Sequence, residues 1–331
     1  MSDSNRFATL DALRGVAALG IMLFHTMPNS PLPIPGGYLA VDLFFAMSGF
    51  VIALSYEDKL RAGMGLRRFL TLRAIRLWPM LALGAVLGIV VHGGHSGMLF
   101  LLPNPFTSGL YPPNPPYWSL LLEVVAYLGF AVLAPRLRLS GLLVLAAVSG
   151  TALAAFTLWS GGLFFEFGGF WSTLPAGLAR VAFSFSIGVL VYRLRKGTGQ
   201  QPVEDIRAWL ILAALAAIMF MMPVSDQAGG QLGGLASVLF AVPLLLWFAT
   251  KWELPARRLA AQLGALSYPL YCIHMPILAI GALQGPGLPF VWLLLIAASL
   301  LLDRYWDRPM RRWLANAFAA SARQTRIGIS T

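Results

Sequence analysis

Two ionisable residues, Arg14 and His25, lie in the first apolar run of the chain, LDALRGVAALGIMLFH. They are 11 residues apart, which in an α-helix is about 20° beyond three full turns and about 16 Å of rise. Both side chains are therefore expected on one helix face, at different depths. Asp11 precedes Arg14 by one turn and is placed to pair with it. Imidazole is the usual general base for a hydroxyl, whereas a guanidinium group suits phosphate.

Four further ionisable side chains belong to later apolar runs. Asp42 lies in GGYLAVDLFFAMSGF and Glu123 in YWSLLLEVVAYL, while Arg73 and Arg76 belong to RRFLTLRAIRLWP. Ionisable groups inside a membrane are costly, so each is a candidate functional residue whose partner must be identified. A carboxylate can orient an imidazole or stabilise its charged form.

The composition identifies lipid as the solvent for most of the chain. Apolar residues make up 58% of the 331 residues and charged residues 11%, a balance that water-soluble globular domains do not show. The single cysteine, Cys272, excludes an intramolecular disulfide. The net charge of +11 does not indicate nucleic-acid binding, because the basic residues form short clusters between apolar runs and no soluble segment is long enough to form a binding domain.

A membrane-spanning helix needs about 20 mostly apolar residues, and about ten runs qualify. They are residues 7–27, 38–56, 72–92, 117–134, 141–160, 174–192, 208–223, 231–250, 263–282 and 288–305. The seventh is short and the eighth begins with GGQLGG, so either could be tilted or partly re-entrant. The predicted fold class is all-α, a polytopic integral membrane protein.

Basic residues mark cytoplasmic loops, and they recur here in alternate loops. The inner group is Lys59, Arg61, Arg67 and Arg68; Arg136 and Arg138; Arg193, Arg195, Lys196 and Arg207; Lys251, Arg257 and Arg258; and Arg308, Arg311, Arg312, Arg323 and Arg326. The outer segments 28–37, 93–116, 161–173, 224–230 and 283–287 contain no Lys or Arg. This alternation predicts an even number of spans with both termini cytoplasmic, and residues 309–331 as a short basic cytoplasmic tail.

The predicted orientation sorts the ionisable residues into two sets. His25, Asp42 and Glu123 fall in the outer half of the membrane, and Arg14, Arg73 and Arg76 fall in the inner half. The first set can handle protons and the second is cationic. This division fits a reaction whose phosphate-bearing donor arrives from the cytoplasm while a neutral hydroxyl acceptor arrives from outside.

Structural interpretations stand beside these functional ones. A histidine near the end of a span often makes only an interhelical hydrogen bond, and arginines at an inner helix end often serve as topological anchors. Asp42 could be a structural partner or a helix cap, and Glu123 could pair with Arg180, the one arginine well inside a span. His274, with Tyr271 nearby in SYPLYCIHMP, is either a core hydrogen-bonding group or a residue that lines a pathway. His92 and His95 lack companion ligands, so no metal site is predicted.

Six segments, in order, resemble those of the membrane-bound acyltransferase 3 family of largely bacterial O-acyltransferases. They are LDALRGVAALGIMLFH with its Arg-x10-His motif, VDLFFAMSGFVI, RRFLTLRAIRLWP with Arg-x2-Arg, YWSLLLEVVAYL, LGALSYPLYCIHMPI and DRYWDRPMRRW. The resemblance covers nearly the whole chain. It implies transfer of an acyl group, commonly acetyl from acetyl-CoA, to a hydroxyl of an extracytoplasmic carbohydrate at the bacterial inner membrane.

The resemblance also assigns roles to residues. It implies that Arg14 and His25 form the essential first-helix pair, that Arg73 and Arg76 meet the acyl-CoA donor, and that Glu123 is a site carboxylate. Acyl-CoA is then a co-substrate, and no permanently bound cofactor is expected.

Two acidic positions carry less definite implications. Asp42 fits the second-helix pattern of the family, so we count it with His25 and Glu123 as a candidate catalytic residue. Asp307 stands where the family's closing motif more usually has Glu, and we interpret it as structural. Residues 1–331 are expected to form a single transmembrane domain without an appended soluble domain, so that transfer is completed in the membrane or passed to a partner protein of polysaccharide synthesis.

The working hypothesis places CoA phosphates at a cytoplasmic mouth lined by Arg14, Arg73 and Arg76. His25, oriented by Glu123 or Asp42, then deprotonates the sugar hydroxyl for direct attack, or a covalent acyl intermediate forms first. Two rivals remain: a transporter or flippase of a glycan or amphiphile, with the buried charges as a proton relay, and a scaffold for a polysaccharide synthase.

Overall fold

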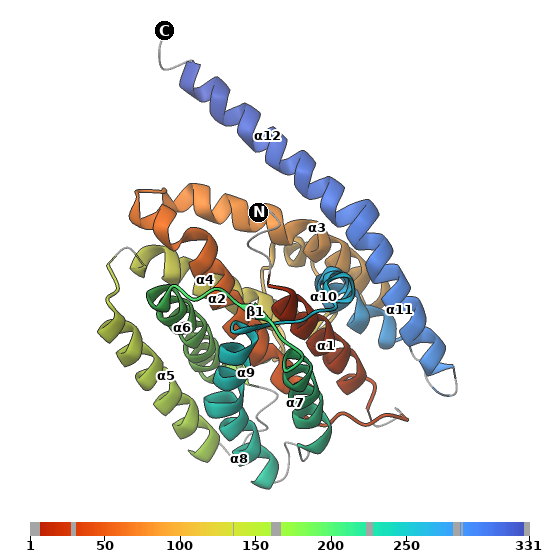
Figure 1. Cartoon of the computed structure of the whole chain (residues 1–331). Coiled ribbons are helices and arrows are strands. Elements are labelled where there is room, and N and C mark those ends of the chain that lie inside the picture. The colour runs from red at the N-terminus through yellow and green to blue at the C-terminus, as the bar shows by residue number, and fades with distance from the viewer. Residues whose placement is uncertain are drawn as a thin grey trace.

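The computed structural model describes residues 7–27, 31–134, 136–159, 167–222, 228–280, 285 and 287–327. Its α-helices are α1 (Ala8–Phe24), α2 (Ala40–Arg61), α3 (Leu66–His92), α4 (Tyr117–Leu133), α5 (Leu139–Trp159), α6 (Leu174–Thr198), α7 (Ala208–Met221), α8 (Ala228–Ala236), α9 (Val242–Ala249), α10 (Arg257–Leu278), α11 (Leu288–Leu302) and α12 (Arg308–Ile327). Short 3-10 turns, η2 (Gly37–Leu39), η3 (Ser96–Phe100) and η5 (Trp171–Thr173), lie between them, and π-turns η6 (Ser237–Ala241) and η8 (Asp303–Asp307) join α8 to α9 and α11 to α12. The fold is a helical bundle (Figure 1).

Every one of the ten predicted spans coincides with a helix, and the eighth is the continuous segment α8–η6–α9. Six helical segments of the described chain are long and apolar enough to cross a membrane: Gly37–Arg61, Leu66–His92, Leu139–Trp159, Trp171–Thr198, Gly230–Ala249 and Leu288–Ala320. The helices Tyr117–Leu133 and Ala208–Met221 are apolar but shorter. The structure thus supports an all-α membrane protein, while the count of ten and the side of each terminus stay predictions.

Helices pack closely at glycines, which place no side chain between the two helix backbones. At Gly188 of α6, an added Cβ would lie 2.0 Å from the carbonyl oxygen of Ala46 in α2. At Gly15 of α1, it would lie 2.4 Å from the Cβ of Leu263 in α10. Lipid does not drive helices together, so such close backbone approach, with its dispersion contacts, is a main source of stability in membrane bundles. These contacts fix α1 on α10 and α2 on α6.

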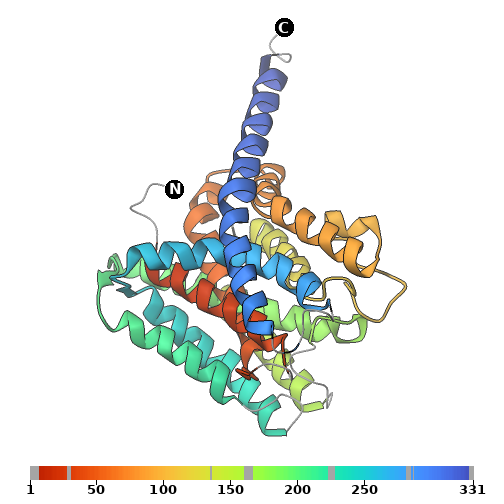
Figure 2. The same cartoon turned by 90° about the vertical axis from the view of Figure 1, so that its right-hand side faces the viewer.

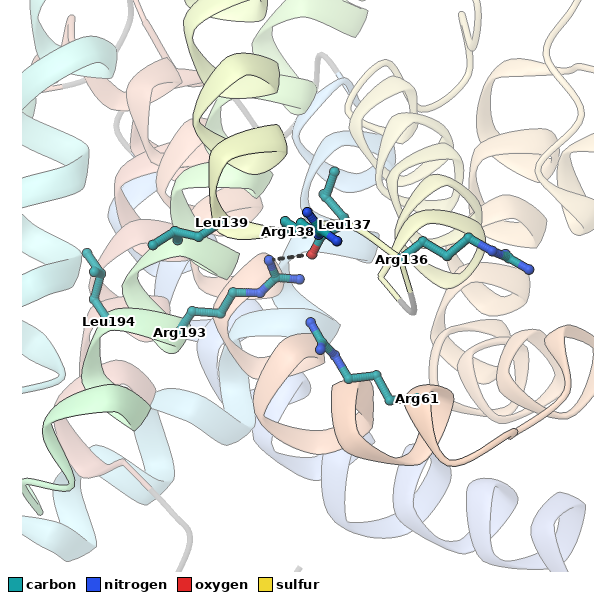
Figure 3. A pocket seen from close by; sticks show the side chains of 7 residues that line it. All are labelled: Arg61, Arg136, Leu137, Arg138, Leu139, Arg193 and Leu194. Carbon is teal, nitrogen blue, oxygen red and sulfur yellow. Dashed lines mark hydrogen bonds between the residues drawn. The ribbon is translucent and has the colours of Figure 1, made fainter.

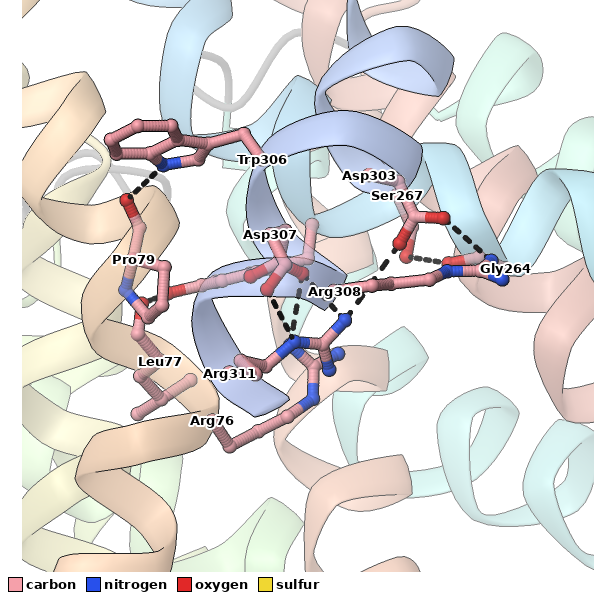
Figure 4. Close-up of polar contacts among 11 residues, drawn as sticks. Arg76, Leu77, Pro79, Gly264, Ser267, Asp303, Trp306, Asp307, Arg308 and Arg311 are labelled. Atoms are coloured by element: carbon pink, nitrogen blue, oxygen red, sulfur yellow. Dashed lines mark hydrogen bonds and ion pairs between the residues drawn. The ribbon is translucent and has the colours of Figure 1, made fainter. Parts of the chain in front are cut away.

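Side-chain donors anchor α3 around its internal proline. Pro79 lacks a backbone N–H and interrupts the helical hydrogen bonding. Tyr268 of α10 donates to the carbonyl of Leu77 at 2.6 Å, and Trp306 of η8 donates to the carbonyl of Pro79 at 3.0 Å (Figure 4). α3 is therefore held by hydrogen bonds to α10 and η8. These bonds fix the position of the basic helical turn that precedes Pro79 in α3.

A small parallel strand pair closes one end of the bundle. β1 (Val203–Glu204) pairs with β2 (Trp252–Glu253). The first turn of α1 docks on this pair, since the Ala8 N–H donates to Glu253 Oε2 at 2.7 Å and the Thr9 hydroxyl donates to the carbonyl of Trp252 at 2.6 Å. A carboxylate at a helix N-terminus accepts a hydrogen bond from a free backbone N–H, and its negative charge interacts favourably with the helix dipole.

The predicted basic tail is helical through residue 327. α12 continues from α11 through η8 and projects beyond the end of the bundle where α2 turns into α3 (Figures 1 and 2).

Candidate functional site

A cavity of about 750 Å³, here called the central cavity, lies among α1, α2, α3, α4, α10 and α12. Its lining on α2 runs from Val41 in the first turn to Lys59 in the last. These positions are 18 residues apart, or about 27 Å of helix rise. A volume of this size is typical of a small-molecule site, and its extent along α2 suits a long ligand.

The three arginines that the sequence predicts to meet the donor all line the central cavity. Five basic and two acidic side chains contribute to its wall: Arg14, Lys59, Arg73, Arg76 and Arg311, with Asp11 and Glu123. The excess of positive charge on this wall favours an anionic ligand.

A hydrogen-bonded chain holds Arg73 in place. Its Nη2 donates to the hydroxyl of Tyr127 at 3.1 Å, and the guanidinium group lies 4.7 Å from the centre of the Tyr127 ring. The Tyr127 hydroxyl in turn donates to Oε1 of Glu123, which also accepts from Ser48 at 2.6 Å. Glu123 thus lines the same cavity as the arginines and, through Tyr127, holds the side chain of Arg73 in position.

Arg76 is held from the C-terminal side of the chain. Its Nη1 lies 3.8 Å from Oδ2 of Asp307, which is paired at 2.7 Å with Arg311 (Figure 4). The guanidinium group also lies 5.2 Å from the centre of the Tyr268 ring. The same Nη1 is buried and has no hydrogen-bond acceptor among the described residues, so it is available to a ligand. Asp307 therefore forms ion pairs with two arginines that line the central cavity, and its structural role stays a prediction.

Arg14 also lines the central cavity. Asp11, Glu123 and Arg76 lie within its electrostatic range. A guanidinium group beside a second one, with carboxylates nearby, is a typical arrangement for binding phosphate oxygens.

His25 lies at the C-terminal end of α1 and contacts another histidine. Its Nδ1 is 3.1 Å from Nε2 of His274 in α10. The Nδ1 of His274 is 3.0 Å from the backbone carbonyls of both Leu270 and Tyr271. Carbonyl oxygens only accept, so we assign the proton of neutral His274 to Nδ1, which leaves its Nε2 to accept from Nδ1–H of His25. This tautomer leaves the Nε2 lone pair of His25 free to act as a base.

Tyr271 lies next to both the central cavity and this histidine pair. It lines the cavity, and its hydroxyl contacts the Ser119 hydroxyl at 2.6 Å and donates to the carbonyl of Pro116 at 2.9 Å. Its ring centre is 5.9 Å from that of His274. The lining of the central cavity includes Tyr271 and neither histidine.

Asp42 is engaged elsewhere. Its carboxylate forms an ion pair with Arg180 at 2.6 Å, and a second hydrogen bond from Arg180 Nε measures 3.0 Å. Both side chains are fully buried. This pair corrects the expectation that Glu123 could be the partner of Arg180, and it places Asp42 in a structural contact.

The expected orienting contact of His25 with Glu123 or Asp42 is not found among the described hydrogen bonds, because both carboxylates bind other groups. His274, predicted only to line a pathway or bond within the core, occupies that position. Sequence reasoning also missed Tyr127 and Ser48. Tyr127 follows Glu123 by four residues, so the helical period alone places them on one face.

No group of three or more His, Cys, Asp or Glu side chains within the described ranges could hold a metal ion. His92 instead contacts the carbonyl of Pro276 at 3.2 Å.

Apolar helices around a cavity with an excess of basic side chains are the features of an integral membrane protein. The acyltransferase domain family matches residues 7–302, so the chain belongs to this family, the membrane-bound acyltransferase 3 family. This membership identifies it as an O-acyltransferase.

Two relatives support this assignment. "Protein 2 in picA locus" of Rhizobium radiobacter is 36% identical over 182 residues, which cover 46% of this chain and 95% of that protein. "Putative peptidoglycan O-acetyltransferase YrhL" of Bacillus subtilis (strain 168) is 22% identical over an alignment of 366 residues, which covers 91% of this chain and 54% of that protein. The chain therefore spans about half the length of the second relative. No solved structure matches the chain.

Proposed function

We propose that this protein transfers an acetyl group from cytoplasmic acetyl-CoA to a hydroxyl of a carbohydrate outside the bacterial inner membrane. Family membership supports the reaction class, and the name of the Bacillus subtilis relative supports a cell-envelope glycan as the acceptor. The loop charges support the orientation, since basic clusters mark the cytoplasmic side.

One observation carries the proposal: Arg14, Arg73 and Arg76, from two different helices, line the same elongated cavity. In the predicted orientation, their end of the cavity faces the cytoplasm. CoA brings several phosphate groups at one end and a thioester at the other end of a long, flexible arm. Arginines at the mouth bind the phosphates, and the cavity then guides the arm toward Tyr271.

The chemistry follows from the tautomer of His25. Its Nε2 takes the proton of the acceptor hydroxyl while that oxygen bonds to the thioester carbonyl carbon. The C–S bond then breaks, and the imidazolium returns the proton to the CoA thiolate. His274 acts as a positioning residue, because its Nε2 accepts from Nδ1–H of His25 and holds the required tautomer.

The proposed reaction also gives a role to Tyr271, because its ring lines the cavity next to His274. In the proposed cycle, Tyr271 gives up its contacts with Ser119 and Pro116 as the thioester approaches His25. Such a step couples access of the donor to a local rearrangement of α10 and α4.

The test uses purified protein in lipid nanodiscs with radiolabelled acetyl-CoA and an envelope glycan as the acceptor. Wild-type protein is expected to transfer label, and His25→Ala to lose at least a hundredfold in rate while eluting as a folded monodisperse protein. His95→Ala is the matched control, because His95 precedes η3 and is not in the hydrogen bond that joins His25 to His274, and it should retain wild-type activity.

Normal transfer by folded His25→Ala would overturn the assignment of the base. Glycan movement across the bilayer without any acetyl transfer would favour a transporter instead.

A further inference from the structure

A second pocket, here called the basic pocket, lies apart from the central cavity. It has a volume of about 520 Å³ and is lined by Arg61, Arg136, Leu137, Arg138, Leu139, Arg193 and Leu194. These residues come from the end of α2, the connection between α4 and α5, and the last part of α6. The basic pocket shares no lining residue with the central cavity. Its four arginines are therefore not explained by the donor site.

The pocket is organised around Arg193. Its Nη1 donates to the carbonyl of Leu137 at 2.8 Å (Figure 3). Its Nε donates to Glu57 at 3.0 Å. Its Nη2 is buried without a hydrogen-bond acceptor among the described residues. A buried cationic N–H with no acceptor is costly, so this atom marks a place for an anionic oxygen.

The positive charge of the pocket is largely uncompensated. Glu57 is shared by Arg193 and Arg61, the latter at 2.8 Å. The side chains of Arg136 and Arg138 have no ion-pair or hydrogen-bond partner in the described ranges, and Arg138 lies beside Leu137 in the turn (Figure 3). The guanidinium group of Arg136 points away from the other three arginines (Figure 3). One carboxylate against the remaining three guanidinium groups leaves a local preference for an anion.

The rim of the pocket is apolar and faces outward. Leu139 is 44% exposed and Leu194 is 42% exposed. Leu143, one turn after Leu139 on α5, is 48% exposed. In a membrane, this exposed leucine face contacts lipid chains. The loop charges place the same end of α5 and α6 at the cytoplasmic surface, so the arginines lie at headgroup level directly beside an apolar face.

We propose that the basic pocket binds the phosphate of an anionic phospholipid from the cytoplasmic leaflet. The unpartnered Nη2 of Arg193 binds a phosphate oxygen, and Arg61 and Arg138 hold the headgroup from either side. The acyl chains lie along Leu139 and Leu143. Basic pockets between helices on the cytoplasmic side are suited to such headgroups, because charge and apolar surface meet there.

The test compares short-chain phosphatidylglycerol, phosphatidylcholine and inorganic phosphate as probes, with the thermal unfolding midpoint of the purified full chain in detergent as the readout. Phosphatidylglycerol is expected to stabilise the wild-type protein saturably, and the other two probes are not. Each basic residue near an anionic lipid strengthens binding roughly fivefold. The double variant Arg61→Gln/Arg138→Gln should therefore lose about 30-fold in affinity.

The matched control is Arg67→Gln/Arg68→Gln, which removes the same charge from two exposed arginines in the first turn of α3. It should bind phosphatidylglycerol as the wild type does. Equal losses in both double variants would show a general charge effect and overturn the site. Unchanged binding by Arg61→Gln/Arg138→Gln would do the same, and stabilisation by inorganic phosphate at similar concentration would show a soluble anion as the ligand.

Discussion

Asp42 forms a fully buried ion pair with Arg180, and replacing it tests whether its role is structural or catalytic. Replacing Asp42 by Asn keeps the side-chain shape but leaves the guanidinium group of Arg180 buried without its counter-charge. Removing one partner of a buried ion pair destabilises a protein by about 3–5 kcal/mol. Both side chains are 0% exposed and are joined by contacts of 2.6 and 3.0 Å, so the upper part of that range is expected.

The double variant Asp42→Asn/Arg180→Gln completes a double-mutant cycle, which measures the free energy of coupling between the two side chains. It buries no charge, so it should recover part of the loss, with a coupling free energy of roughly 0.5–3 kcal/mol. Arg180 also lies 5.5 Å from the ring centre of Trp118, and that contact is lost in the double variant, which keeps the recovery incomplete.

The assay has two parts: denaturant unfolding of each purified variant in detergent, and acetyl transfer per mole of folded protein. A structural Asp42 predicts lower stability in both single variants and near-normal specific activity in whatever remains folded. A folded, fully stable Asp42→Asn protein with no activity, and no recovery in the double variant, would refute this reasoning and return Asp42 to the catalytic set.

Three further outcomes are expected. Arg73→Lys keeps the charge but loses the planar group over Tyr127, so KM for acetyl-CoA should rise about tenfold with a smaller change in kcat; a fall in kcat alone would contradict donor binding. Gly188→Ala forces a Cβ to within 2.0 Å of the carbonyl of Ala46 and should cost at least about 1–3 kcal/mol, seen as a lower unfolding midpoint. Burial raises the pKa of the Glu253 carboxyl, so its ionisation lowers stability as pH rises above its ordinary pKa through the raised one. Glu253→Gln should therefore gain stability relative to wild type as pH rises, and a pH-independent difference would contradict this.

The helices were largely predictable because apolar length determines them. Each predicted run contains a helix. Polar residues extend some helices beyond the apolar part by as much as six residues, as at the start of α3 and at the end of α6. The helical period predicts a common face for Arg14 and His25. It does not predict that Arg14 lines the central cavity whereas His25 contacts His274, because periodicity says nothing about which side chains of a neighbouring helix lie at each depth.

The partners of the ionisable residues were harder to predict. Depth placed Asp42 and Glu123 in the same half of the membrane, but depth does not give the rotation of one helix against another. That rotation directs Asp42 toward Arg180 and Glu123 toward Arg73 through Tyr127. His274 was visible in the sequence, and only the packing of α1 on α10 identifies His25 as its partner.

The extent of the central cavity has an electrical consequence. Its lining follows α2 for about 27 Å, close to the roughly 30 Å thickness of the hydrocarbon core. In the proposed reaction, a proton passes inward from the external hydroxyl to the thiol of CoA while the acyl group passes outward, so the charge on each side of the membrane is the same before and after a turnover. The overall equilibrium is therefore independent of the transmembrane voltage, and the thioester alone drives acetylation forward.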